Sequence, residues 1–500
     1  MNILIFTLII FMAGLICPTA AVWAGTLEQV FQHPPRPATP WVYWIWLRTP
    51  TTPAAMTRDL EAMKAKGISG FILYDNGAGN IEKLNRKMVL RDKAFVSVPT
   101  DDFKGEFSTP LPVLPTWSAE WRQEIRFVAR ESKRLGLDFC LTIGLAGCSA
   151  PGLDPQYAQQ QLVWSSQEMV GPNNFDGTLP PPSPSKKMKD FDVLSKAYRE
   201  VAVLAVPVTD HIKPADVLDI SAQMDAAGHL HWAVPSGRWR ILRFGQMPIG
   251  IANPWGLFCD HLSAEAFDQN WALTMAPLLK AMTAEERGAM KYVEDDSWEA
   301  GHPTWTKTFP EEFQKRRGYS LTPYLPILAG QMTADATTAA RFKRDYALTV
   351  SDLELDYYYG HMKSVCNANG LTLYAEANGP NYQGINLTQA GFRVDHDMGE
   401  FWMPSAHRPA PAQRFLTRDA VTANHLKGDP ITMCEAFTSV APLWSETPFS
   451  MKACADQAFC DGVNRVCFHN YSHSTPLDAK PGDVYFARDN QRTPVLHPTR

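Results

Sequence analysis

Acidic side chains follow short apolar runs in the second half of this 500-residue chain. The run 290–293 leads into Glu294, Asp295 and Asp296, and Glu299 comes three residues later. Three further runs end in the same way, at Glu376, Glu400 and Glu435. Carboxyl groups are seldom buried unless they are paired, so strand ends that bear several of them favour cation binding or acid/base chemistry.

Glycoside hydrolysis is one reaction that needs such groups, because it places a protonated acid and a second carboxyl group across the scissile bond. Glu299 is the candidate acid, since the neighbouring Trp298 and the acidic residues 294–296 both favour its protonated form. The alternative for any one of these glutamates is an ion pair with an arginine at a strand end. The sequence contains no Gly-x-Ser-x-Gly or His-Glu-x-x-His motif, which leaves serine-hydrolase and zinc-protease chemistry without support.

Strands and helices alternate along most of the chain. Thr52 caps a helix that begins at Pro53 and stops at Gly67, and Ser118 caps another that Gly136 ends. The expected strands are 41–46, 71–74, 139–143, the stretch 290–299, 371–376, 394–402, 431–435 and 463–469. This alternation predicts an α/β protein with a (β/α)8 TIM-like barrel.

In such a barrel the active-site groups sit at the C-terminal ends of the strands, so residues far apart in sequence meet at one mouth. The residues expected there are Glu299, Glu376, Glu400, Glu435, His469 and the aromatic residues Trp44, Trp298, Trp402 and Trp444.

The barrel pattern is interrupted between its third and fourth strands. Runs at 201–206, 229–234 and 239–244 predict a small antiparallel unit, with Pro235-Ser236-Gly237 as a hairpin turn. The expected division is residues 1–24 as a signal peptide, 25–143 as the first part of the barrel, 144–282 as a β-rich insertion with a return helix, and 283–500 as the second part.

The apolar run 3–16 and the small residues that follow it indicate a secretory signal peptide without a membrane span, and hence an exported protein of the periplasm or the extracellular space. A net charge of -5 provides no electrostatic surface for nucleic acid. Of nine cysteines, Cys17 lies in the leader, and the remaining eight permit disulfides whose pairing stays open.

Several short segments, taken in order, resemble glycoside hydrolase family 106, the inverting α-L-rhamnosidases. Three of them contain the candidate glutamates: Asp296-Ser297-Trp298-Glu299, Gly399-Glu400-Phe401-Trp402 and Glu435-Ala436-Phe437-Thr438. The others fall at 43–46, 58–64, 133–137, 201–204, 256–263, 309–319 and 459–465. The loops at 48–53 and 144–149 depart from the family pattern.

The resemblance implies removal of terminal α-L-rhamnose from plant-type polysaccharides or glycosides with inversion. Glu299 would be the general acid, and Glu435, helped by Glu400, would position and deprotonate the attacking water. An inverting pair stands roughly 6.5–9.5 Å apart. The resemblance also implies a calcium ion that contacts sugar hydroxyl groups, with its ligands unassigned, and no organic cofactor.

The remaining polar residues near the mouth are candidates for sugar or calcium contacts. Those assigned to substrate binding are Glu294, Asp296, Glu376, Trp402 and His469. Members of the family usually continue into C-terminal β-domains, so a chain that stops at Arg500 is expected to be truncated. Two alternatives remain: a carbohydrate-binding protein with impaired catalysis, and a glycosidase for another sugar of pectin.

Overall fold

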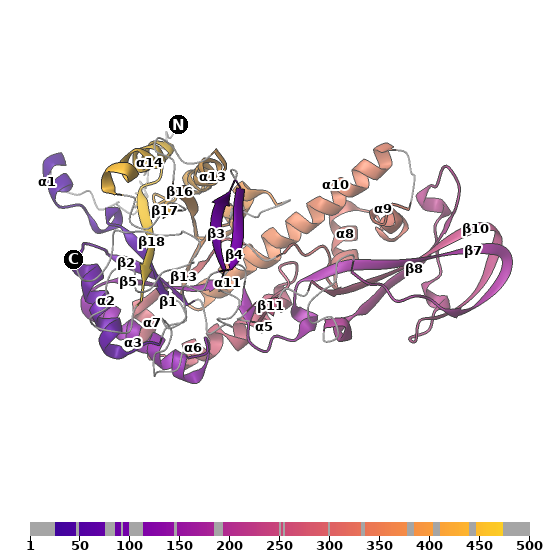
Figure 1. Cartoon of the computed structure of the whole chain (residues 1–500), viewed down its shortest axis with the longest axis horizontal. Helices are drawn as coiled ribbons and strands as arrows, with labels where there is room; N and C mark the ends of the chain where they lie inside the picture. The colour runs from indigo at the N-terminus through magenta and orange to yellow at the C-terminus, as the bar shows by residue number, and fades with distance from the viewer. Residues whose placement is uncertain are drawn as a thin grey trace, which may run out of the picture.

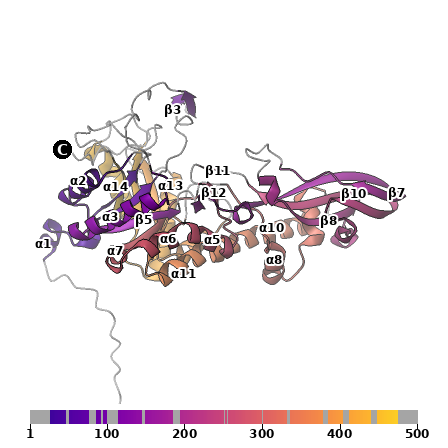
Figure 2. The ribbon, with the colours of Figure 1, turned by 90° about the horizontal axis from the view of Figure 1, so that it is seen from below.

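The computed structural model describes residues 26–46, 50–75, 86–91, 94–99, 114–144, 148–184, 194–249, 252–253, 256–298, 301–331, 336–377, 385–403, 411–439 and 447–473. The described parts form a barrel-like body and an elongated β-rich unit that extends away from it, as the two views in Figures 1 and 2 agree. The helix α10 (Ala336–Leu353) runs between the two (Figure 1).

The body is built on a nine-stranded sheet in which every neighbouring pair is parallel. Its strands, in chain order, are β1 (Trp41–Trp46), β2 (Gly70–Asp75), β5 (Asp138–Gly144), β13 (Met290–Asp295), β14 (Thr372–Ala375), β15 (His396–Asp397), β16 (Gly399–Met403), β17 (Met433–Ser439) and β18 (Arg465–Ser472). The order across the sheet is β15-β14-β13-β5-β2-β1-β18-β17-β16. The edge strands β15 and β16 are separated along the chain only by Met398, so the sheet is nearly closed. The barrel-like parallel sheet expected from the sequence is confirmed.

Alternation along each strand divides the side chains between an inner and an outer layer. In β1, Trp41, Tyr43 and Ile45 belong to an inner cluster with residues such as Tyr374 and Cys467. The intervening Val42, Trp44 and Trp46 belong to an outer cluster with the helices. Both layers of β1 are therefore buried, which is why its sequence reads as an uninterrupted apolar run.

Helices cover the outer face of the sheet. They are α2 (Pro53–Ala65), α3 (Ala119–Leu135), α5 (Ala264–Leu273), α6 (Met275–Ala281), α7 (Ala284–Ala289), α11 (His361–Ala368), α12 (Leu387–Arg393), α13 (Pro411–Lys427) and α14 (Pro448–Asp461). The expected caps of the first two are present: Thr52 accepts a hydrogen bond from Ala55 N, and Ser118 accepts one from Trp121 N. Gly136 ends α3 in a left-handed conformation with φ 71°.

Asp59 is a buried carboxylate that joins α2 to the sheet. It accepts hydrogen bonds from Trp44 Nε1 at 3.2 Å and Tyr471 Oη at 3.2 Å. Arg58 lies 2.6 Å away and His473 Nδ1 also lies 2.6 Å away. Because Trp44 and Tyr471 come from β1 and β18, the first and last of the described strands, this network fixes the point where the two strands meet.

The β-rich unit is a four-stranded antiparallel sheet, ordered β7-β10-β8-β9. Its strands are β7 (Gln160–Thr178), β8 (Arg199–Pro207), β9 (Leu218–Asp219) and β10 (His229–Pro248). The expected hairpin turn at Pro235-Ser236-Gly237 is wrong. Residues 229–248 form one strand with a register shift between Val234 and Gly237, because the long strand β7 pairs with both halves.

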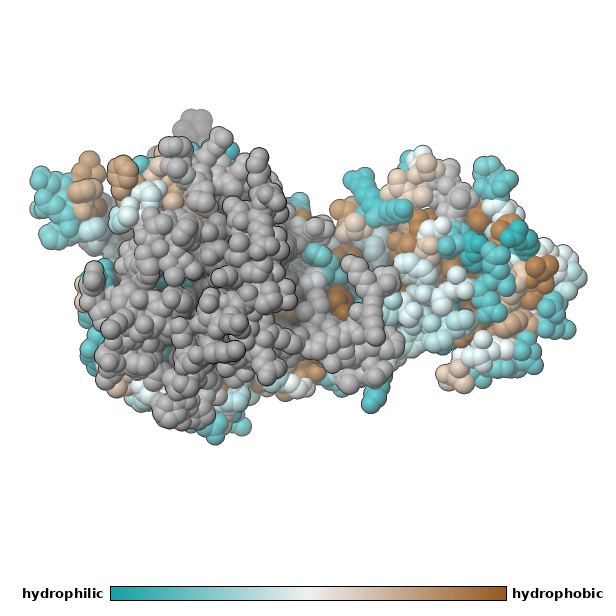
Figure 3. Space-filling model, viewed as in Figure 1, coloured by the Kyte–Doolittle hydropathy of each residue, from teal (hydrophilic) through white to brown (hydrophobic). Residues whose placement is uncertain are grey.

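Helices also pack on this sheet. Apolar side chains of α8 (Phe309–Arg317), α9 (Leu325–Leu328) and α10 share one buried cluster with β8 and β10, including Phe309, Phe342 and Leu242. A π-helical segment, η8 (Glu354–Gly360), connects α10 to α11 and to the body. Figure 3 shows hydrophilic and hydrophobic residues mixed over the exposed face of the unit.

The remaining elements are short. Apart from short 3-10 helices, they are the helix α1 (Leu27–Gln32), the hairpin of β3 (Arg86–Arg91) and β4 (Ala94–Pro99), and a small sheet of β6 (Ser149–Ala150), β11 (Ala252–Asn253) and β12 (Gly256–Phe258). Among the described helices, none has the length and apolar character needed to cross a bilayer.

Candidate active site

Carboxyl groups gather inside the sheet at the C-terminal ends of its strands. Glu294 on β13 follows the inward-facing Tyr292 by two residues, and Glu376 follows Tyr374 in the same way at the end of β14. Strand alternation therefore directs both carboxyl groups to the interior. On the other side, Glu400 and Glu435 are register partners on the adjacent strands β16 and β17.

Tyr43 connects two of these groups from the inner face of β1. Its hydroxyl lies 3.2 Å from Glu294 Oε1 and 3.3 Å from Glu376 Oε1. Thr142, the register partner of Glu294 on β5, donates to Glu294 Oε2 at 2.7 Å. All four side chains are buried. A network of hydroxyl and carboxyl groups thus holds the floor of the mouth in place.

Burial of this network favours neutral carboxyl groups. It raises the pKa of Glu294 from 4.5 to about 8, with a further contribution from the nearby Glu435, although hydrogen bonds from Thr142 and Tyr43 oppose the shift. Burial likewise raises the pKa of Glu376 well above its ordinary value, and the neighbouring carboxyl groups, Glu435 first, add to this effect. Near pH 7, Glu294 is therefore mostly protonated.

Glu435 is held by different partners. The Thr438 hydroxyl donates to Glu435 Oε1, and His469 Nδ1 lies 3.7 Å from the same oxygen. Burial lowers the pKa of His469 to about 3, so the imidazole is neutral near pH 7 and does not form an ion pair with Glu435. Thr438 also lies 3.1 Å from His469 Nδ1, which places one hydroxyl between the two side chains.

Glu400 is oriented by the residue two positions along its own strand. Trp402 Nε1 donates to Glu400 Oε2 at 3.2 Å, while the Glu400 carbonyl oxygen accepts a hydrogen bond from Thr417 on α13. Glu400 is buried and Trp402 is half-buried. The indole therefore positions the carboxyl group beside Glu435.

Asp296, Glu376 and Glu435 form a cluster suited to a cation. Their ligand oxygen atoms lie within 4.8 Å of one another. Two oxygens bound to one calcium ion at about 2.4 Å each are at most about 4.8 Å apart. Glu376 Oε2 is buried and has no hydrogen-bond partner among the described residues. Carboxylate oxygens are the donors that calcium prefers, so these residues fit the ion implied by the resemblance.

The candidate acid Glu299 lies outside the described residues, as do Trp444 and the expected signal peptide at 1–24. The described chain reaches Trp298, which is 5% exposed and whose ring contacts that of His261 at 4.4 Å between centroids. Of the residues expected at the mouth, the structure brings together Glu376, Glu400, Glu435 and His469 with Glu294 and Asp296. The expectation for Trp44 is wrong: it alternates with Tyr43 and therefore points outward to Asp59.

Sequence reasoning missed the hydroxyl groups that hold the carboxyl groups, namely Tyr43, Thr142 and Thr438. Side chains alternate between inward and outward positions along a strand. The alternation that places Glu294 inward, applied to β1 and β5, would also have found Tyr43 and Thr142 at inward positions. The alternation does not predict the role of Thr438, because its contact with Glu435 depends on the irregular end of β17. There the register shifts and Phe437 has φ 67°.

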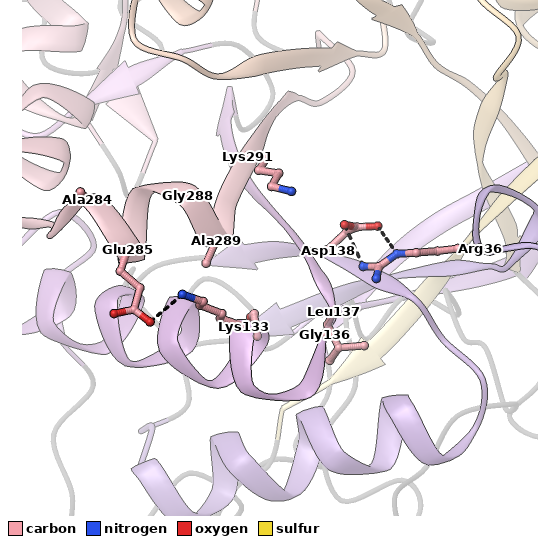
Figure 4. Close-up of a pocket in the computed structure, with 11 residues that line it drawn as sticks. Arg36, Lys133, Gly136, Leu137, Asp138, Ala284, Glu285, Gly288, Ala289 and Lys291 are labelled. Carbon is pink, nitrogen blue, oxygen red and sulfur yellow. Dashed lines mark hydrogen bonds and ion pairs between the residues drawn. The ribbon is translucent and has the colours of Figure 1, made fainter. Parts of the chain in front are cut away.

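A separate surface pocket of about 670 Å³ lies at the other end of the strands (Figure 4). Asp138 begins β5 there and forms an ion pair with Arg36 at 2.9 Å, and Lys133 pairs with Glu285 at 2.7 Å. Barrel enzymes place their catalytic groups at the C-terminal ends of the strands. The paired charges in this pocket are therefore assigned no catalytic role.

A nearly closed parallel sheet with carboxyl groups at the C-terminal ends of its strands is the arrangement of barrel glycosidases. The model of glycoside hydrolase family 106, described as alpha-L-rhamnosidase, matches residues 186–493. The chain belongs to this family.

Two known proteins are similar over most of the chain. A protein of Formosa agariphila named "Putative beta-glucuronidase" is 30% identical over 487 residues, which cover 91% of this chain and 38% of that protein. The structure of a rhamnosidase from Novosphingobium sp. PP1Y matches with a TM-score of 0.73 at 20% identity, over 91% of this chain and 57% of that one. The chain thus spans 38% and 57% of the lengths of these two proteins.

Proposed function

We propose that the chain is the catalytic part of an exported, inverting α-L-rhamnosidase. The observation that supports this most is the meeting of Asp296, Glu376, Glu400 and Glu435 at one mouth of a family 106 chain. The resemblance of the motifs around Glu299, Glu400 and Glu435 supports the assignment of roles. The substrate is a carbohydrate with terminal α-L-rhamnose, and the apolar run 3–16 supports export to the periplasm or the medium.

The proposed architecture is a (β/α)8 barrel. In it, β15 and β16 are two parts of a sixth strand, interrupted at Met398, which closes the sheet. Residues 25–143 and 283–500 make up the barrel, and 144–282 form the β-rich insertion with its return helix. The helices α8 to α10, which follow the fourth strand, belong to the barrel segment in sequence and support the insertion by packing.

In the proposed reaction, Glu435 is the base that deprotonates the attacking water, and Glu299 is the acid that protonates the leaving oxygen. The hydrogen bond from Thr438 fixes the orientation of the Glu435 carboxyl group. Because His469 is neutral, it leaves the negative charge of Glu435 available for accepting a proton. Glu400, oriented by Trp402, holds the water from the adjacent strand.

The neutral carboxyl group of Glu294 has a different role. A protonated carboxyl group can donate a hydrogen bond to a sugar hydroxyl, which an ionised one cannot do. Its protonation also limits the negative charge around Glu435, since several ionised carboxyl groups in so small a space would repel one another. We assign Glu294, with His469 and Trp402, to sugar contacts or to holding the groups that make them, and Glu376 to a sugar contact made through the ion described next.

We further propose that calcium binds to Asp296 and Glu376, with Glu435 at the edge of the cluster. Bound there, the ion would contact sugar hydroxyl groups and offset the repulsion among the carboxyl groups. The protein residues orient the sugar and move the protons. Removal of calcium with EDTA should therefore weaken substrate binding more than it slows hydrolysis of the bound substrate.

The test is hydrolysis of an aryl α-L-rhamnoside by the 500-residue chain. Glu435→Gln should lower kcat by at least about 100-fold, in the range typical of a lost general base. Glu61→Gln on the exposed side of α2 is the matched control and should keep wild-type activity. Undiminished turnover by Glu435→Gln would contradict the proposed role of this residue.

A glycosidase for another sugar is a second candidate, which the name of the Formosa relative favours. A uronic acid bears a carboxylate that requires a cationic partner. The guanidinium of Arg465 is a candidate partner inside the sheet. It lies near Trp41 and Tyr374 at the N-terminal end of the strands, away from the mouth. The described residues of the mouth are mostly acidic, which suits a neutral sugar such as rhamnose better.

Parallel assays separate these candidates. Release of the aryl group from the rhamnoside but not from the matching β-D-glucuronide is expected, and the reverse would favour the second candidate. Heat of binding to rhamnosides in calorimetry, without turnover of rhamnosides, glucuronides or pectin fragments, would instead identify a carbohydrate-binding protein.

A further inference from the structure

Two histidines and an aspartate meet on the β-rich unit, on strands distant from the barrel mouth. His229 and His231 lie on β10, and Asp176 lies on β7, opposite His231 in the register. Both strands extend away from the body in Figures 1 and 2. These residues are absent from the motifs that support the proposed glycosidase, so the arrangement requires a separate explanation.

Strand alternation places the three side chains on one face. Leu230 and Trp232, the neighbours of His231, are buried in the apolar cluster on the other face of the sheet. His229 and His231 consequently face solvent, with side-chain exposures of 34% and 64%. The start of β10 is fixed by Asp225, whose carboxylate accepts hydrogen bonds from the backbone N–H groups of Ala227 and His229.

The three side chains lie close enough together to share one metal ion. His229 Nδ1 lies 3.1 Å from His231 Nε2. Asp176 Oδ1 lies 2.9 Å from His231 Nδ1 and 3.4 Å from His229 Nε2. Two nitrogen ligands of a tetrahedral zinc ion, each at about 2.0–2.1 Å, are about 3.3 Å apart. The pair His229 Nδ1 and His231 Nε2 has this spacing, whereas the distances to Asp176 involve the other nitrogen of each ring. One ligand atom from each residue lies within 4.8 Å of the other two.

The donor types indicate which ion fits. Two imidazoles and one carboxylate are the ligands of borderline metals such as zinc, whereas calcium and magnesium prefer oxygen donors alone. We propose that Asp176, His229 and His231 form a zinc-binding site, with water in the fourth position. This site differs in place and in donor chemistry from the carboxylate cluster at the barrel mouth.

The position of the site suggests what zinc would do. β8 pairs with residues 239–246 of β10. Residues 229–234 lie beyond this stretch and pair with β7 along one edge. Along their other edge the strand has a single bridge, between Leu230 and Met224. A two-stranded ribbon is marginally stable in water. An ion held by both strands would fix this end of the ribbon in its register, because the ligands come from β7 and β10 together.

Isothermal titration calorimetry with zinc chloride tests the proposal. The 500-residue chain is first freed of zinc and then kept in excess calcium chloride, which occupies the carboxylate cluster. Wild type should bind one zinc ion. His231→Ala and Asp176→Asn should each weaken binding at least about tenfold, the least that loss of a supporting group costs a metal site. His211→Ala, which removes an exposed histidine of the same unit, should bind zinc as wild type does.

Thermal unfolding provides a second readout that does not depend on catalysis. Zinc should raise the midpoint of unfolding of wild type and His211→Ala, and should raise that of His231→Ala less at the same zinc concentration. Rhamnoside hydrolysis should be the same in all of these variants, which would confirm that they are folded. The absence of zinc binding by wild type, or equal binding by wild type and His231→Ala, would overturn the proposal.

Discussion

Glu294→Gln should make the protein less sensitive to alkaline pH. Glu294 is buried beside Tyr43 and Thr142, and its raised pKa means that folding favours the protonated form. Glutamine has the same shape and remains neutral at every pH. Its amide can accept a hydrogen bond from one of the two hydroxyl groups and donate to the other, so the buried network stays satisfied.

The magnitude follows from the two pKa values. A group whose pKa is raised in the folded state stabilises the protein fully below its unfolded pKa and loses that contribution as the pH rises through its folded pKa. For Glu294 this window extends from about pH 4.5 to about pH 8. At about 1.4 kcal/mol per pKa unit, the loss amounts to about 5 kcal/mol. For a chain of this length, about 5 kcal/mol corresponds to a change in Tm of about 5 °C.

The assay is thermal unfolding in EDTA from pH 5 to pH 8.5, because a bound cation would itself favour the ionised carboxylate. Wild type and Glu294→Gln should have similar Tm values at pH 5, and the variant should exceed wild type by about 5 °C at pH 8. Parallel Tm curves for the two proteins would refute the reasoning, since they would mean that Glu294 is ionised throughout the range.

Glu286→Gln is a control of opposite sign. Burial opposes ionisation of Glu286, but hydrogen bonds from Arg126, the Thr283 backbone and Arg130 lower its pKa to about 2. A lowered pKa gives stability that is present above the unfolded value and is lost only as the pH falls through about 2. Glu286→Gln should therefore be less stable than wild type by a constant amount from pH 5 to pH 8.

Further variants test the remaining contacts. Asp59→Ala should lower the free energy of unfolding in urea by about 3–5 kcal/mol, because it leaves buried polar partners unpaired, whereas Glu61→Ala on the same helix should change it by about 0.5 kcal/mol or less. Thr438→Val should lower kcat for the rhamnoside by about tenfold with KM unchanged, since it removes the hydrogen bond to Glu435; a rise in KM alone would contradict this. EDTA should raise KM for the rhamnoside and added calcium should restore it, and an activity indifferent to both would exclude the proposed calcium site.

The sequence predicted the elements of the barrel well, because their signals are local. Thr52 and Ser118 cap helices at the expected positions, and apolar runs form the parallel strands. The meeting of Glu376, Glu400 and Glu435 also followed from the sequence, since the C-terminal ends of parallel strands converge.

Other features depend on contacts that a local pattern does not contain. Pro235-Ser236-Gly237 has the composition of a turn, yet pairing with the long strand β7 makes it a bulge inside one strand. Trp44 was expected at the mouth because of its residue type, but a shift of one position along a strand reverses the direction of a side chain. The raised pKa of Glu294 depends on complete burial, which only the folded structure establishes.

The central proposal is tested most directly by the anomer that the chain releases from an aryl α-L-rhamnoside, followed by NMR in the first minutes of reaction. An inverting mechanism, in which Glu435 activates water opposite the acid Glu299, predicts that β-L-rhamnose forms first and then mutarotates. Initial release of α-L-rhamnose would contradict it, because retention requires a covalent intermediate on one of the carboxyl groups.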